Sequence, residues 1–258
     1  TDPDAAQRER AARLLGNRLA VCVDADTPAC AQALIAAARP AATEAGWRAA
    51  VRDAVTYRSR PQGISGLTAD RVADAIQSEV DAANDCVFIC DGGEFGQWVQ
   101  GFVNAPVRLI NGTSGVIGGC LPYALAATIA RPGATVIVAM GDGTAGFHFA
   151  EFETAARENT GFVAVIGNDA RWNAEYAIQM REYGADRTIG CELSEAARYD
   201  RAAEAFGCDA AFATTADEVA VALEKAVASG RPTCVEARIA PVPAPQFSRT
   251  GTAAPGAH

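Results

Sequence analysis

Long apolar runs and clusters of basic residues are both missing from this sequence of 258 residues. The chain carries 31 acidic and 22 basic residues, and its formal net charge is −9 at pH 7. An acidic balance without a basic cluster argues against binding to nucleic acid or to an anionic membrane surface. No apolar stretch is long enough to cross a bilayer. We therefore expect neither a nucleic-acid partner nor a membrane. Half of the residues are hydrophobic, which is enough for one large core.

Histidine is scarce, and the cysteines lack the spacing of a metal site. The two histidines are His148 and His258, so a histidine-based metal centre has almost no material. The eight cysteines contain no C-x-x-C pair, and several lie inside apolar segments. This pattern predicts buried free thiols in a cytoplasmic protein, and it disfavours a disulfide scaffold or a zinc site.

The middle of the chain has the pattern strand, turn, helix, strand. The apolar run Ala134–Met140 predicts a buried parallel strand, and Gly141–Gly143 follows it as a sharp turn. We expect a helix over Phe147–Asn159 and a second buried strand over Phe162–Ile166. Ligands of open α/β sheets bind at the carboxyl ends of such strands.

Oxygen-bearing side chains follow both of these strands. Asp142 comes after the first strand, and Asp169 comes after the second, 27 residues later. Mg²⁺ prefers octahedral oxygen coordination and shares its ligands with phosphates. A helix N-terminus after Gly143 would add backbone N–H groups and a favourable dipole for an anion. The stretch therefore predicts a hard cation that holds a diphosphate. The alternative is a structural turn in an ordinary doubly wound domain.

This stretch resembles the thiamine diphosphate motif, GDG followed later by NN, of the acetolactate synthase and benzoylformate decarboxylase superfamily. That superfamily also contains oxalyl-CoA decarboxylases, 2-hydroxyacyl-CoA lyases and benzaldehyde lyases. The resemblance implies that thiamine diphosphate and Mg²⁺ are the cofactors. It implies that the Mg²⁺ ligands are the side chains of Asp142 and Asp169 and the carbonyl of Arg171. The residues that it assigns to the diphosphate are Gly141, Asp142, Gly143, Thr144 and Ala145. The chain departs from the motif at Asp169, where the family usually has its second Asn.

Two further glycine-rich turns follow predicted strands. By position in the family, Gly93 and Glu94 of the first turn contact the far side of the diphosphate; a tight turn before a helix is the alternative. Ile117 in the second turn matches the apolar residue that props the cofactor into its bent form; an ordinary core isoleucine is the alternative. The bent form places the two reacting parts of the cofactor close together, so that proton transfer is intramolecular.

In this family, the loop with the expected ligands Asp169 and Arg171, called the metal loop below, is followed by a segment that lines the substrate channel. The resemblance therefore makes Trp172, Asn173, Tyr176 and Gln179 the candidates for substrate specificity. His148 lies close behind the GDG turn and could be taken for a base. Its apolar neighbours favour packing or a subunit contact instead.

The chain divides into three segments at this level. Residues 1–60 resemble the tail of a central domain and a linker helix, with a short strand at Leu19–Val23. Residues 61–240 form the diphosphate-binding domain, and residues 241–258 are predicted to be a mobile tail. We expect a doubly wound α/β fold with a mainly parallel sheet. The expected strands are 86–90, 107–110, 134–140, 162–166, 210–213 and 233–239. Expected helices include 42–57, 68–84, 194–206 and 216–228.

The glutamate that activates the cofactor in the resembled family has no counterpart in this sequence. In enzymes of that family it comes from a separate pyrimidine-binding domain. We therefore expect a second chain that carries this domain, in a hetero-oligomer with two or more copies. The predicted function is the Mg²⁺–thiamine diphosphate subunit of a carbon–carbon lyase or carboligase. Its substrate class is a 2-oxo acid, an aldehyde or a 2-hydroxyacyl-CoA.

Two alternatives remain open at this stage. The chain could be a catalytically silent regulatory or assembly subunit that retains the fold. A nicotinamide-binding protein is disfavoured, because no G-x-G-x-x-G follows the first strand with an acidic residue closing the next one.

Overall fold

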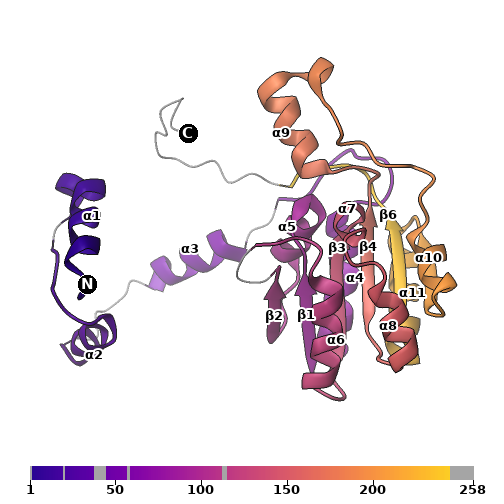
Figure 1. Cartoon of the computed structure of the whole chain (residues 1–258), viewed down its shortest axis with the longest axis horizontal. Coiled ribbons are helices and arrows are strands. Elements are labelled where there is room, and N and C mark those ends of the chain that lie inside the picture. The colour runs from indigo at the N-terminus through magenta and orange to yellow at the C-terminus, as the bar shows by residue number, and fades with distance from the viewer. Residues whose placement is uncertain (1, 20, 38–44, 57–58, 112–114, 245–258) are drawn as a thin grey trace. The chain divides into compact units, whose positions relative to one another are not determined.

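The structure is a computed structural model that describes residues 2–19, 21–37, 45–56, 59–111 and 115–244 (Figure 1). The chain separates into two compact units, Thr1–Tyr57 and Arg58–His258. Within the described ranges, no helix combines the length and apolar character needed to cross a lipid bilayer.

The first unit is helical. Its elements are α1 (Ala5–Leu15), the 3₁₀ turn η1 (Gly16–Arg18), α2 (Thr27–Ala37) and α3 (Ala45–Thr56). Asp4 caps α1, because its Oδ1 accepts a hydrogen bond of 2.8 Å from the N–H of Ala6. No described residue of α1 or α2 is buried. The predicted identity of residues 1–60 as the tail of a central domain stays a prediction.

The strand expected at Leu19–Val23 is wrong for its described residues, none of which is in a strand. A strand needs a neighbour with which to pair its backbone groups. The described contacts of this segment are of another kind, such as the N–H of Asp2 donating to the carbonyl of Val23. The helix expected at 42–57 is described as α3, and residues 42–44 and 57 lie outside the described residues.

The second unit is built on a sheet of six parallel strands. These are β1 (Cys86–Cys90), β2 (Val107–Ile110), β3 (Thr135–Gly141), β4 (Val163–Asn168), β5 (Asp209–Ala213) and β6 (Thr233–Arg238). Their order across the sheet is β2-β1-β3-β4-β6-β5, and every pair is parallel. This confirms the predicted doubly wound, mainly parallel α/β fold.

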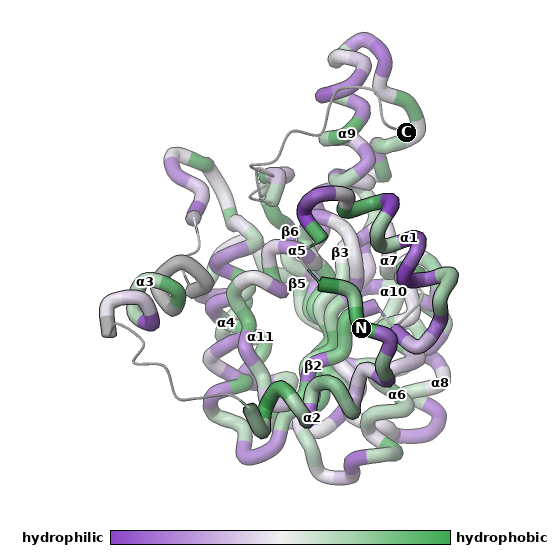
Figure 2. Tube along the Cα trace, turned by 90° about the vertical axis from the view of Figure 1, so that its left-hand side faces the viewer, coloured by the Kyte–Doolittle hydropathy of each residue, from purple (hydrophilic) through white to green (hydrophobic). Residues whose placement is uncertain are grey.

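Burial explains why these segments are strands. Every residue of β1 and β4 is buried, and β3 and β6 are buried along almost their whole length. A parallel sheet covered on both faces requires such continuous apolar runs. Figure 2 shows the resulting hydrophobic centre in green. The edge strands β2 and β5 alternate or remain half-exposed.

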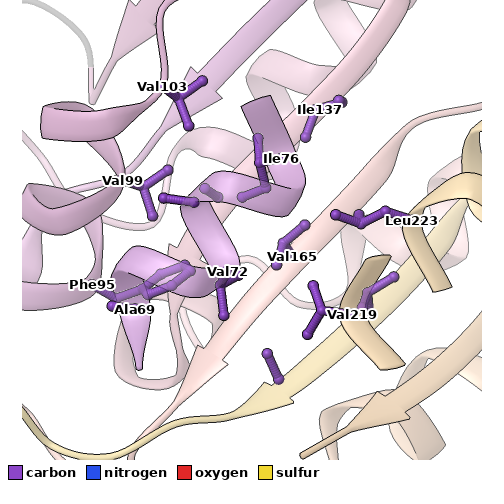
Figure 3. Close-up of a cluster of buried hydrophobic side chains, with 14 of the residues drawn as sticks. Ala69, Val72, Ile76, Phe95, Val99, Val103, Ile137, Val165, Val219 and Leu223 are labelled. Atoms are coloured by element: carbon purple, nitrogen blue, oxygen red, sulfur yellow. The ribbon is translucent and has the colours of Figure 1, made fainter. Parts of the chain in front are cut away.

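Helices cover both faces of the sheet. One face carries α4 (Ala69–Ala82), α5 (Gly93–Phe102) and α11 (Ala216–Ser229). Figure 3 shows Val72 and Ile76 of α4 and Leu223 of α11 packed around Val165 of β4. The other face carries α6 (Cys120–Ala130), α8 (Glu151–Glu158) and α10 (Tyr199–Ala205). Thr215 and Glu218 form a capping box at the start of α11, with each side chain accepting from the other residue's backbone.

Two expected helices are shorter than predicted. The helix expected at 147–159 begins only at Glu151, as α8, because residues 147–150 form a turn. In this turn Phe149 packs on Phe152 and Tyr199, with ring centroids 4.8 and 5.8 Å away. A separate short helix, α7 (Asp142–Ala145), lies before the expected range. The helix expected at 194–206 begins only at Tyr199. Before it, the Ser194 hydroxyl accepts from the N–H of Ala196, which is the local bond of a turn.

The chain leaves the sheet in opposite directions after β1 and β3. Helix α5 follows β1 onto one face, and α8 follows β3 onto the other. Two adjacent strands whose connections diverge in this way leave a crevice at their carboxyl ends, where ligands of such sheets bind.

Candidate functional site

A pocket of about 120 Å³ lies at this divergence. Four segments line it: the turn after β1, the loop before α6, the turn after β3 and the loop after β4. It brings together most of the residues singled out in the sequence, namely Gly93, Glu94, Ile117, Gly141, Asp142, Gly143, Thr144, Asp169, Arg171, Trp172 and Asn173. Ala145 is buried behind it, and Tyr176 and Gln179 lie outside its lining.

The GDG turn is held tightly by its neighbours. Gly141 pairs with Gly167 across β3 and β4, so the two strands end at the same level. A Cβ added to Gly143 would lie 2.8 Å from the Trp172 ring, and one added to Gly167 would lie 2.4 Å from the Phe95 ring. Close packing against these two rings therefore requires a glycine at both positions.

The loop after β4 has an unusual backbone. Ala170 has φ +57°, in the left-handed region that residues with a side chain rarely adopt. Its N–H donates to Oδ1 of Asn168 at 3.0 Å. Residues 191–193 also hydrogen-bond to this loop, and these bonds are called the clamp below. The N–H of Trp172 donates to the carbonyl of Cys191, and the N–H of Leu193 donates to the carbonyl of Ala170, both at 2.8 Å.

This clamp sets the direction of the Arg171 backbone. Arg171 forms an antiparallel bridge with Glu192. The two hydrogen bonds of this bridge are made by the residues on either side of the pair, as given above, and not by Arg171 or Glu192 themselves. In an antiparallel pair of this type, the N–H and C=O of the bridged residue point to the other side. The Arg171 carbonyl therefore points away from residues 191–193 and is not used by this bridge. Its role as the third metal ligand stays a prediction.

Burial strongly affects the two aspartates. It raises the pKa of Asp142 to about 6, against a smaller opposing effect of nearby backbone N–H groups. Burial and then the charge of Asp142 raise the pKa of Asp169 to about 7. Two like charges in a buried site destabilise each other, and a bound cation removes that cost.

One oxygen of this pair is uncompensated. Oδ1 of Asp142 accepts from the N–H of Gly143 at 2.8 Å, whereas Oδ2 is buried and no described group makes a hydrogen bond to it. The N–H groups of Ala170 and Arg171 influence this carboxylate electrostatically but do not reach hydrogen-bonding geometry with Oδ2. A buried oxygen without a donor is costly in the free protein and well suited to a cation. The residues present therefore fit a divalent metal.

The site cannot hold a metal with side chains alone. In the described part of the chain, no group of three or more His, Cys, Asp or Glu side chains could hold a metal ion. Two carboxylates and one carbonyl leave an octahedral ion short of ligands. Mg²⁺ fits this donor set, because it commonly takes one or two carboxylates and completes its shell with phosphate oxygens and water.

The loop that carries Ile117 is fixed by Asp91, which the sequence analysis did not single out, and by His148. Asp91 is fully buried, and its two oxygens accept from the N–H groups of Gly92 at 2.7 Å and Gly118 at 2.9 Å. His148 Nδ1 lies 2.8 Å from the Gly118 carbonyl, which requires a proton on Nδ1. His148 thus contacts this loop and does not line the pocket. An Asp directly before two glycines at a strand end is the signal that could have identified Asp91.

Glu94 is engaged by the start of the C-terminal segment. Its carboxylate accepts from the N–H of Ala244, and burial raises its pKa, partly offset by this bond. Trp98 Nε1 donates to the carbonyl of Val242 at 2.9 Å. Residues 242 and 244 therefore pack against α5. Residues 245–258 of the predicted mobile tail lie outside the described residues.

The four specificity candidates divide into two pairs. Trp172 and Asn173, at the start of α9 (Asn173–Tyr183), line the pocket. The Tyr176 ring lies under the Arg171 guanidinium, 4.5 Å from its centroid. Gln179 bonds the backbone of Ile189 in both directions, at 2.8 and 3.2 Å. The second pair supports the loops around the pocket instead of lining it.

Residues 91–237 match a family model described as thiamine pyrophosphate enzyme, C-terminal TPP binding domain. The chain belongs to this family. The matched segment contains all of the residues that line the pocket. The domain that the sequence pattern indicated is thus a thiamine pyrophosphate-binding domain.

Similar proteins are much longer than this chain. A probable acetolactate synthase of Mycobacterium bovis is 34% identical over 154 residues, which cover 58% of this chain and 28% of that protein. A 2-hydroxyacyl-CoA lyase 2 of Xenopus laevis is 34% identical over 128 residues, covering 47% and 19%. The chain therefore spans less than a third of either relative.

A solved structure shares the fold. The thiamine diphosphate-dependent 4-hydroxybenzoylformate decarboxylase of Rhodococcus jostii RHA1 superposes with a TM-score of 0.63 over 71% of this chain and 34% of its own. The sequence identity is 21%, so the likeness concerns the fold alone.

Proposed function

We propose that this chain is the Mg²⁺–thiamine diphosphate-binding part of a lyase or carboligase that breaks or forms a carbon–carbon bond next to a carbonyl. The pair of carboxylates at this pocket, with Asp142 buried and Asp169 partly buried, carries this proposal. Asp142 and Asp169 follow adjacent strands, line one pocket and have raised pKa values, and Oδ2 of Asp142 is without a hydrogen bond from any described group.

Each wall of the pocket has a proposed task. Asp142, Asp169 and the Arg171 carbonyl hold Mg²⁺, and the ion binds diphosphate oxygens. Backbone N–H groups of Thr144 and Ala145 lie in the first turn after β3 and donate to the diphosphate, while the Gly143 N–H holds Oδ1 of Asp142. Ile117 supports the cofactor from the loop that Asp91 and His148 fix. When bound, the cofactor supplies the electron sink for the bond change.

We propose that a second chain completes the site and supplies the activating glutamate. The pocket of about 120 Å³ is smaller than the roughly 300–1,000 Å³ of ordinary ligand sites. Helix α6, which follows the Ile117 loop, has no charged residue, and its Tyr123 and Ile129 are exposed. A helix that is apolar all round is normally buried. The pyrimidine-binding domain of the second chain is the proposed cover of this face, in a hetero-oligomer.

The substrate class follows from what the relatives are called. They include an acetolactate synthase and a 2-hydroxyacyl-CoA lyase, so the proposed substrate is a 2-oxo acid, an aldehyde or a 2-hydroxyacyl-CoA. Release of CO₂ from a 2-oxo acid favours the first reaction type, and cleavage of a 2-hydroxyacyl-CoA to an aldehyde favours the second.

Calorimetry on the full chain tests the binding step. Thiamine diphosphate should bind with Mg²⁺ present and bind much more weakly after a chelator is added, because the ion links diphosphate to protein. Thiamine without its diphosphate is the matched control and should not bind measurably. Equal binding of both compounds, or binding that is insensitive to Mg²⁺, would contradict the proposal.

Native mass spectrometry of the protein from its own source tests the partner. The expected species contains a second, larger chain with thiamine diphosphate and Mg²⁺. If a complex forms and its activity survives Asp142→Ala in this chain, the chain is a silent regulatory or assembly subunit. A lone chain that is fully active would refute the second-chain proposal.

A further inference from the structure

A buried acidic side chain lies behind the metal loop and outside the pocket. Glu236 is on β6, which pairs with β4, and its side chain is completely buried. A buried carboxyl group is costly unless its oxygens are hydrogen-bonded. The pocket does not include Glu236, and no step of the proposed function uses it.

The two oxygens of Glu236 hold two different elements. Oε1 accepts from Nδ2 of Asn168 at 2.7 Å. Oε2 accepts from the N–H of Asp200, at the start of α10, at 3.1 Å, and it lies 3.9 Å from Nε of Arg198. Glu236 therefore connects the end of β4 to the start of α10.

The bond to Asn168 decides which way that amide faces. With Nδ2 held by Glu236, Oδ1 faces the opposite direction and accepts from the N–H of Ala170 at 3.0 Å and from Arg238 Nη1 at 3.3 Å. A flipped amide would place its NH₂ group against both donors. Asn168 is itself fully buried, so it has no solvent to replace a lost partner.

The bond to Ala170 stabilises the left-handed turn of the metal loop. Ala170, at φ +57°, lies between Asp169 and Arg171, the two proposed ligands on this loop. Such a conformation persists only where surrounding contacts hold it. The chain of contacts runs from Glu236 through Asn168 to Ala170, and each link is a hydrogen bond of 3.0 Å or less.

We infer that Glu236 is a positioning residue for the metal loop. By orienting the Asn168 amide, it holds the turn that presents the Asp169 carboxylate and the Arg171 carbonyl to one divalent ion. The inference rests on the proposed function for the identity of that ion. Groups that support metal ligands in this way affect metal affinity by 10- to 100-fold when they are removed.

The test uses the full chain and Mn²⁺, which binds oxygen sites and is detected by electron paramagnetic resonance. Mn²⁺ is titrated into wild type and variants at a fixed concentration of thiamine diphosphate. Glu236→Met removes both acceptors with little change in shape, and we expect its Mn²⁺ affinity to fall by about tenfold or more. Glu236→Gln keeps an acceptor for Asn168 and should bind nearly as wild type does. Val235→Ala is the control, because Val235 is fully buried on the same strand but faces the other core cluster.

Hydrogen exchange at the Ala170 amide gives a second readout that needs no metal. Glu236→Met should accelerate exchange there selectively, whereas Val235→Ala should not. If Glu236→Met does not fold, Glu236→Asp replaces it, since its carboxylate ends one methylene short of Asn168. Unchanged Mn²⁺ affinity and unchanged Ala170 exchange in Glu236→Met, or in Glu236→Asp where it replaces Glu236→Met, would overturn the inference, and so would an equal loss of affinity in Val235→Ala. Absence of Mn²⁺ binding in wild type would instead overturn the proposed function, while the exchange measurement still decides the role of Glu236.

Discussion

Two pairs of acidic side chains lie near the same edge of the sheet, and they differ in how far their oxygens are hydrogen-bonded. Asp200, Glu236 and Asp142 are buried, and Asp169 is partly buried. In the first pair, Arg198 Nη2 lies 2.7 Å from Asp200 Oδ2, and both oxygens of Glu236 accept hydrogen bonds. In the second pair, Asp142 and Asp169, one buried oxygen has no hydrogen bond from any described group.

The pKa directions express part of this difference. In the first pair, burial opposes ionisation of Asp200, yet its hydrogen bond with Arg198 and the bonds that follow lower its pKa overall, whereas burial raises the pKa of Glu236. Asp142 and Asp169 have no such cation nearby that outweighs burial, and their pKa values rise to about 6 and about 7. Similar chemistry therefore serves two purposes: the compensated pair fixes structure, and the uncompensated pair is prepared for a ligand.

The largest effects are expected when one acidic residue of each pair is replaced by alanine. Asp142→Ala should weaken Mg²⁺-dependent binding of thiamine diphosphate by at least about 100-fold, because even groups behind the ligands are worth 10- to 100-fold. The ligand-free variant should be as stable as wild type, since an uncompensated buried oxygen is removed. Calorimetry and thermal unfolding measure both quantities.

Asp200→Ala is the matched variant from the other pair. It should lower the free energy of unfolding by about 1–3 kcal/mol, because hydrogen bonds of the buried network are lost, and it should leave cofactor affinity nearly unchanged. The comparison fails if the two variants exchange these results, with Asp142→Ala unfolding easily and Asp200→Ala losing the cofactor.

Ionisation of Asp142 and Asp169 should lower the free energy of unfolding of the ligand-free protein, and a pH series should show this. Asp142 and Asp169 have folded-state pKa values above their ordinary ones, so between about pH 4 and 7 the folded protein holds more protons than the unfolded chain. The free energy of unfolding of the ligand-free protein should therefore fall by several kcal/mol as pH rises through this range. The stabilisation given by Mg²⁺ with thiamine diphosphate should grow over the same range. Urea unfolding at each pH, with and without ligand, measures this, and a ligand effect independent of pH would contradict it.

A smaller effect is expected where the turn meets Trp172. In Gly143→Ala the new Cβ would lie 2.8 Å from the Trp172 ring, so the ring must move, at a cost of about 1–3 kcal/mol. Gly146→Ala is the matched control, because its Cβ would lie 3.4 Å from one backbone oxygen and needs little adjustment. Thermal unfolding and Trp fluorescence report the change. Equal behaviour of the two variants would show that Trp172 is not held against this turn.

The strands of the sheet were predictable because burial on both faces leaves a direct trace in sequence. β1 and β2 coincide with the expected segments, and the other four strands agree within two residues at each end. The helix expected at 147–159 is wrong in its first part, because four residues form a turn in which Phe149 packs against Tyr199 of a distant segment. Local periodicity does not contain such a contact.

The pocket was partly predictable for a related reason. Asp142 and Asp169 follow strands directly, so parallel pairing alone brings them together. Asp91 bonds Gly118, which is 27 residues away, and Asn168 bonds Glu236, which is 68 residues away. An acidic residue within an apolar strand suggests a buried partner, but its identity depends on strand order and register, which the sequence pattern did not specify.

The smallest effect is expected from Asp169→Asn, which leaves one carboxylate without a like charge beside it. Asp169→Asn restores the amide that the family usually has and removes one of the two like charges. The charge of Asp142 is the second cause of the raised pKa of Asp169, so the variant removes the carboxyl group with the higher pKa and leaves Asp142, whose pKa is about 6. The ligand-free protein should gain roughly 1 kcal/mol near neutral pH. The pH at which Mg²⁺ starts to stabilise the protein should move lower, while an amide oxygen still serves as a ligand.

Titration of the binding enthalpy against pH measures the shift. A midpoint that stays in place would mean that Asp142 and Asp169 do not share one ion, and the magnesium site would then have to be built around Asp142 alone.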